Sequence, residues 1–155
     1  MRLRILHHLH RTAPGTINYR FHQVLAALDL LGPYDLTWIL SGAIVTWPDD
    51  LLDSQNELLP DPGLRFSKDN QSFVCTHDFF LRIAHGLEGD WTEIHATRAP
   101  WNQLGPQLQA DIPDLPCEFR FECIDAAFWT LESSNDDVAD RLQAHGFVTE
   151  PVEQP

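Results

Sequence analysis

The sequence is short of basic residues, of cysteine and of long apolar runs, and each shortage excludes a class of protein. Its 155 residues include 10 lysines and arginines against 23 acids, a net charge of −13. Phosphate contacts require basic patches, so we expect no nucleic acid among the partners. Three cysteines without C-x-x-C spacing predict neither a disulfide framework nor a zinc ribbon. No run approaches the roughly 18 apolar residues of a membrane helix and no signal-peptide cleavage site follows the N-terminus, so we place the protein in the cytoplasm.

Familiar catalytic and phosphate-binding motifs are also missing. The chain contains no G-x-G-x-x-G, no G-x-x-x-x-G-K-[ST], no H-E-x-x-H and no G-x-S-x-G. His7, His8 and His10 invite a metal interpretation, but neighbouring residues of a strand point to opposite sides and no acid or cysteine nearby completes a ligand set. Cys75 and His77 are residue types of a Cys/His pair, yet their spacing matches no catalytic signature. We therefore expect no catalytic residue, no metal and no cofactor.

Apolar periodicity predicts one α+β domain over residues 1–155. We expect a mixed or antiparallel sheet of about five to six strands with three to four helices. A Pro-rich ordered loop is predicted at 100–116, because four prolines fit neither a regular helix nor an interior strand, and a short flexible tail after residue 148. The predicted strands are 2–9, 34–47 with a bulge at Gly42, 91–97, 117–123 and 127–132; the predicted helices are 16–31, 48–59, 77–85 and 134–145.

The C-terminal third has the plainest pattern. Cys117, Phe119, Phe121 and Cys123 alternate with charged residues, as in a strand with one wet face. This alternation predicts that both of these cysteines lie on the apolar face. Cys75 precedes a predicted helix cap, where it would pack as part of the helix entry. All three thiols are thus predicted to be structural.

One segment also resembles a known group of proteins. Residues 119–147 read FRFECIDAAFWTLESSNDDVADRLQAHGF. This strand, turn, aromatic strand and short acidic helix is similar to the segment that closes several families of small bacterial immunity proteins, the cytoplasmic antidotes to polymorphic toxins. The resemblance covers about a fifth of the chain, and it implies direct binding of a toxin without catalysis.

Acidity and this resemblance together predict a small binding protein whose partner is a basic protein, most simply a toxin domain. From Asp111 onward there are 11 acids and two arginines, whereas the first 20 residues carry four arginines and no acid. Opposed charges accelerate association, and tryptophan is enriched at binding hot spots. The candidate partner-binding residues are Glu118, Glu122, Glu132, Asp136, Asp137, Asp140, Trp47 and Trp101.

Two other interpretations stay open on the sequence. A secretion chaperone of the type III kind is also small and acidic, and it would dimerise and hold an extended effector segment. An enzyme with an unrecognised His/Asp/Cys site is the second. A cluster of titratable side chains lining a pocket would favour the enzyme.

Overall fold

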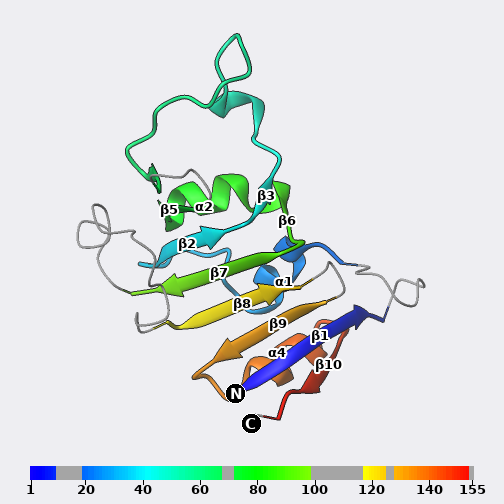
Figure 1. Cartoon of the computed structure of the whole chain (residues 1–155). Helices are drawn as coiled ribbons and strands as arrows, with labels where there is room; N and C mark the ends of the chain where they lie inside the picture. The colour runs from blue at the N-terminus through cyan, green and yellow to red at the C-terminus, as the bar shows by residue number, and fades with distance from the viewer. Residues whose placement is uncertain (10–18, 68–71, 99–116, 125–127, 154–155) are drawn as a thin grey trace.

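The computed structural model describes residues 1–9, 19–67, 72–98, 117–124 and 128–153 (Figure 1). Strands dominate these residues, and the α-helices are short. In chain order the elements are β1 (Arg2–His8), α1 (Phe21–Ala27), β2 (Thr37–Ser41), β3 (Ile44–Val45), the 3₁₀ turn η1 (Asp49–Leu51), β4 (Leu64–Phe66), β5 (Ser72–Thr76), α2 (His77–Ile83), the 3₁₀ turn η2 (Ala84–Gly86), β6 (Leu87–Glu88), β7 (Thr92–Thr97), β8 (Phe119–Cys123), β9 (Trp129–Ser133), α4 (Val138–Ala144) and β10 (Phe147–Pro151).

Eight strands form one sheet in the order β10-β1-β9-β8-β7-β2-β5-β4, and all of its pairs are antiparallel. The remaining two strands, β3 and β6, form a separate antiparallel ribbon. The N- and C-terminal strands are neighbours at one edge of the sheet, where β1 pairs with β10 (Figure 1).

Three helices cover one face of the sheet, and this face holds the core. Phe121 of β8 is fully buried and meets Phe21 of α1 edge to face, with 5.0 Å between the ring centroids. Trp38 of β2 stacks on Phe80 of α2 at 3.7 Å. Leu142 of α4 is buried in the same cluster. Each helix therefore contributes an apolar side chain to a single core.

The sheet is larger than the sequence predicts. The expected five to six strands with three to four helices are wrong: the described residues contain an eight-stranded antiparallel sheet, a second ribbon and three α-helices of seven residues each. Short strands cause much of the error, because β3, β4 and β6 span only two or three residues. A period of two is not recognisable over so few positions.

Gly42 breaks the long strand that was expected over residues 34–47. Its φ is +67°, in the region that favours glycine, and a Cβ here would lie 2.2 Å from the carbonyl oxygen of Trp91. The Thr92 hydroxyl donates a hydrogen bond to the Gly42 carbonyl at 2.9 Å. The chain therefore leaves the main sheet after β2 and enters the ribbon as β3.

The expected helix over residues 48–59 is also wrong. Only η1 is helical there, and hydrogen bonds between side chain and backbone organise the rest. The Asp53 carboxylate accepts from the backbone N–H groups of Gln55 at 2.8 Å and Glu57 at 3.0 Å. Asn56 has a φ of +59°. Such local bonds compete with the helical ladder, and here they produce a compact turn.

The remaining sequence expectations are confirmed, corrected or outside the described residues. The Thr76 hydroxyl caps α2 by accepting from the Phe79 N–H at 3.3 Å, and Gly146 stands after α4 with a φ of +85°. The chain then continues as β10, so residues 149–151 pair with β1 where a flexible tail was expected. The Pro-rich segment 100–116 and residues 16–18 of the predicted helix 16–31 fall outside the described residues, and α1 covers only Phe21–Ala27 of that helix.

The burial of Phe121 yields a stability prediction. Replacing Phe121 by alanine removes a ring with no exposed surface and leaves a cavity beside Phe21. The free energy of unfolding should fall by about 3 to 5 kcal/mol in urea denaturation, with an unchanged dependence on denaturant. A loss below about 1 kcal/mol would show that β8 presents its other face to the core.

Candidate functional site

The β3–β6 ribbon presents exposed apolar side chains beside acids. Ile44 of β3 lies opposite Glu88 of β6, and it is 51% exposed. Trp91 follows β6 and is 68% exposed, the most exposed of the large apolar side chains described. Its backbone approaches Gly42 closely, so Trp91 and Ile44 flank the same end of the ribbon. A large aromatic ring left in water beside a second exposed apolar side chain is typical of a protein-binding surface.

An acidic protrusion, formed by residues 46–63 between β3 and β4, extends from the other end of the ribbon (Figure 1). Its base is anchored by Leu51, which is 5% exposed and packs in the core. The Leu59 N–H donates to the Leu51 carbonyl at 2.8 Å and holds the two sides of the protrusion together. Arg82 of α2 forms ion pairs with Asp50 at 3.3 Å and Asp61 at 3.4 Å. The protrusion is therefore presented in a fixed shape.

The ribbon and the protrusion carry negative charge with little compensation. Residues 42–63 and 84–92 contain seven acids and neither lysine nor arginine. In the described chain, no ion pair reaches five of these acids, all of them exposed: Asp49, Asp53, Glu57, Glu88 and Asp90. We give the name ribbon face to the exposed part of the ribbon and the protrusion, namely these five acids with Ile44, Trp47, Asp50 and Trp91.

On the face of the sheet opposite the helices, which we call the open face, acids are paired with arginines. The acids alternate with arginines across neighbouring strands. Glu122 of β8 accepts from Arg2 of β1 at 3.0 Å and from Arg120 at 2.7 Å, and Arg120 also reaches Glu93 of β7 at 2.9 Å. These charges are satisfied within the molecule, so they offer less to a charged partner than the ribbon face does.

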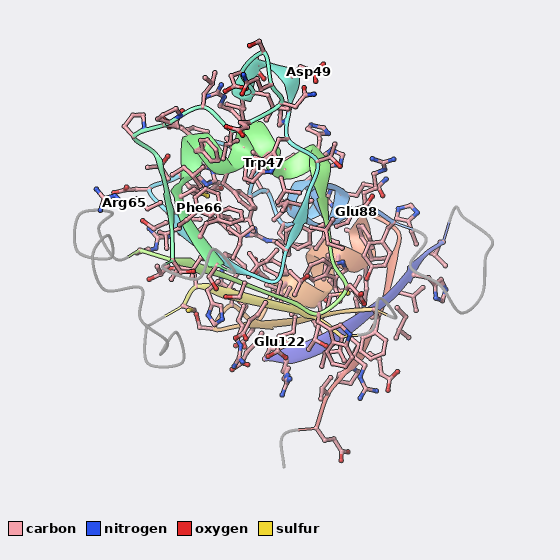
Figure 2. The ribbon with its side chains drawn as sticks, turned by 45° about the horizontal axis from the view of Figure 1, so that its top comes forward. Trp47, Asp49, Arg65, Phe66, Glu88 and Glu122 are labelled. Carbon is pink, nitrogen blue, oxygen red and sulfur yellow. The ribbon has the colours of Figure 1, made fainter. Side chains whose placement is uncertain are left out.

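The predicted partner-binding residues do not form one surface. Glu118 is ion-paired with Arg98, and Glu122 belongs to the network of the open face. Glu132 is half-buried on the same face. Figure 2 shows Glu122 on the opposite side of the sheet from Trp47 and Asp49.

The three aspartates at the start of α4 are exposed, and Asp137 is paired with Arg141 at 2.8 Å. Trp47 is half-buried against Phe73 at 5.8 Å. Trp101 lies outside the described residues. Of the seven candidates that the structure describes, only Trp47 belongs to the ribbon face.

Sequence reasoning missed Trp91, Glu88 and the protrusion. The signal was present in the charge pattern, since 22 residues from Gly42 to Gly63 carry five acids without one basic residue. The acids near Asp49 were interpreted as helix-start residues, and Trp91 as the start of a strand. Neither prediction used the sequence Glu88-Gly89-Asp90-Trp91, in which a tryptophan follows two acids.

The three thiols have different surroundings. Cys75 and Cys123 are buried in the core, as expected, and burial raises the pKa of Cys75 well above its ordinary value. The prediction for Cys117 is wrong: it is half-buried outside the core, and its sulfur lies 3.1 Å from Nδ1 of His95. Alternation fails here because β8 begins only at Phe119.

Two general features of the described residues bear on function. No group of three or more His, Cys, Asp or Glu side chains among them is placed to hold a metal ion. None of the helices in that part of the chain has the length and apolar character needed to cross a membrane.

Comparison of the chain with models of protein families, with curated proteins and with solved structures found no match. Function must therefore be argued from the surface and the chemistry of this chain.

The exposure of Trp91 yields a second prediction, with Trp38 as its matched control. Trp91→Ala should change the free energy of unfolding by less than about 1 kcal/mol, because its ring already contacts water. Trp38→Ala should cost about 3 to 5 kcal/mol, because its buried ring is stacked on Phe80. Urea denaturation measures both. Equal losses would mean that Trp91 is a structural residue rather than a surface anchor.

Proposed function

We propose that this chain is a small acidic binding protein that holds a basic protein partner against the ribbon face. The partner that fits the acidity and the resemblance of residues 119–147 is a toxin domain, which the chain neutralises by direct binding. One observation carries the proposal: the most exposed of the described tryptophans and an exposed isoleucine stand among acids that no ion pair of the described residues compensates.

The apolar and the acidic residues of this face have separate tasks in binding. Trp91 and Ile44 lose water when a partner covers them, and such central aromatic anchors supply much of the affinity of an interface. Asp49 and Glu88 act earlier, because their field attracts a basic surface while it is still at a distance. Figure 2 shows Trp47, Asp49 and Glu88 on the same side of the molecule.

The ordered state of the protrusion favours tight binding. The Asp53 carboxylate and the Leu51–Leu59 hydrogen bond fix its backbone before any partner arrives. A surface that is already in its binding conformation loses less conformational entropy on association. A protein that neutralises a toxin by covering its surface needs a rigid binding face of this kind.

The third prediction tests the acidic side of the proposal. Two double variants, Asp49→Lys with Glu88→Lys and Asp136→Lys with Asp140→Lys, each raise the net charge from −13 to −9. The ribbon-face variant should slow association at least about tenfold at low salt, because it reverses charge at the contact. The α4 variant should change the association rate by much less, since only the overall charge differs. Where the gene next to that of this chain encodes a secreted protein, its C-terminal domain is the partner to test, and stopped-flow mixing gives the rates.

The same experiment includes the apolar side and the outcomes that count against the proposal. Trp91→Ala should accelerate dissociation by about tenfold or more while association changes little. If the α4 variant slows association as much as the ribbon-face variant, the binding surface lies elsewhere. If the purified wild-type chain neither binds a toxin domain of that origin nor protects cells from it, the proposed function is wrong.

A further inference from the structure

On the face of the sheet opposite the helices, the buried side chain of His95 lies between the thiol of Cys117 and the carboxylate of Glu93. His95 of β7 is 2% exposed. Its Nδ1 lies 3.1 Å from Sγ of Cys117, and its Nε2 lies 2.5 Å from Oε1 of Glu93. The three side chains thus form a chain in the order thiol, imidazole, carboxylate. This is the arrangement of a nucleophile, a base and a group that orients the base.

The direction of the two hydrogen bonds follows from the carboxylate. Glu93 can only accept when ionised, so Nε2 of His95 carries the proton and donates to it. In the neutral imidazole, Nδ1 then has a free electron pair that faces the Cys117 thiol. The thiol donates its proton to that nitrogen. A base positioned in this way takes the proton of the thiol when the sulfur attacks.

The sheet holds this chain of side chains in place. Arg120 of β8 donates to Glu93 through Nε at 3.1 Å and lies opposite His95 in the β7–β8 register. It also reaches Glu122, which Arg2 of β1 binds from the other side. Side chains fixed by neighbouring strands keep their geometry better than side chains on loops.

The thiol opens into a cavity of the size of a small-molecule site. The cavity has a volume of about 360 Å³, and its wall includes His95, Cys117, Arg120, Glu132 and Ser134. Pockets for small ligands begin at about 300 Å³. The charged groups of the wall include both signs, with the Arg120 guanidinium facing carboxylates. A small uncharged molecule therefore suits it better than an ion.

The resting thiol needs this base. Burial is the main influence on the pKa of Cys117 and raises it, Arg120 opposes the increase, and Glu93 and Glu132 add to it. The thiol is therefore protonated at neutral pH, and a protonated thiol is a weak nucleophile. Without proton transfer to His95, Cys117 would react more slowly than an ordinary solvent-exposed thiol.

We propose that Cys117, His95 and Glu93 form a nucleophilic thiol site that accepts the acyl group of a small uncharged ester. Sγ attacks the carbonyl carbon while the thiol proton moves to Nδ1 of His95. The carbon–oxygen bond to the leaving alcohol then breaks, the alcohol takes that proton, and a thioester remains on Cys117. Water, deprotonated by the same nitrogen, hydrolyses the thioester, which releases the acid and restores the thiol. Glu93 is a positioning residue, because it acts through His95.

The probe is p-nitrophenyl acetate, added to the native full-length chain at pH 7. We expect about one equivalent of p-nitrophenolate per chain in a first phase, and an acetyl group on Cys117 by peptide mass spectrometry. Cys117 should be acetylated at least about tenfold faster than glutathione under the same conditions. The first phase should vanish in Cys117→Ala. His95→Gln should slow it about 100-fold, the usual contribution of a general base.

The pH dependence of the wild-type rate keeps the proposal testable even if His95→Gln fails to fold. An unassisted thiol reacts about tenfold faster with each pH unit below its pKa, in proportion to its thiolate. Acylation assisted by His95 should depend less steeply on pH, because the imidazole and not hydroxide takes the thiol proton. Glu93→Gln keeps a hydrogen-bond acceptor and should lower the rate at pH 7 without abolishing it. A rate no greater than that of glutathione, a tenfold rise per pH unit through neutrality, or acetylation elsewhere would each overturn the proposal.

Discussion

The antiparallel register of β7 with β8 decides which side chains of the two strands lie on each face of the sheet. It places Ile94 beside Phe121 on one face of the sheet and His95 beside Arg120 on the other. On the first face the apolar pair receives Phe21 of α1, and burial of these groups stabilises the fold. On the second face the alternation gathers charged side chains that neutralise one another. A shift of one residue would exchange the two faces and destroy both.

The open face and the ribbon face differ in whether their acids have basic partners. The arginines of β1 and β8 pair with Glu122 and Glu93 on the open face, where the sulfur of Cys117 lies against the buried His95. The ribbon is joined to the main sheet through Gly42, whose positive φ turns the chain out of β2. Acids on the ribbon and the protrusion therefore lie away from the arginines of the sheet. Their field is available to a basic partner, whereas that of Glu122 is already used.

The sequence allowed the C-terminal part of the fold to be predicted better than the middle. Phe119 to Cys123 and the helix after Ser134 have clear periods, and both elements are present. Between Gly42 and Gly63 the leucines suggested a helix, and that prediction was wrong. The backbone there is organised instead by hydrogen bonds that the Asp53 carboxylate accepts from nearby N–H groups. Periodicity cannot detect such bonds.

The candidate sites were harder to predict, for a related reason. Glu118 and Glu122 look available in the sequence, but Arg98 and Arg2, which pair with them, lie 20 and 120 positions away. The Cys117–His95–Glu93 chain unites residues of β7 with a thiol more than 20 positions away. Only the sheet register shows that these residues meet, and register depends on the whole fold.

Hydrogen–deuterium exchange of the complex decides the proposal that the ribbon face binds a basic toxin domain. With that domain bound, exchange should slow in residues 44–59 and 86–92 and stay unchanged in α4 and in β8. Slower exchange confined to α4 or to the open face of the sheet, with the ribbon as fast as in the free protein, would contradict it.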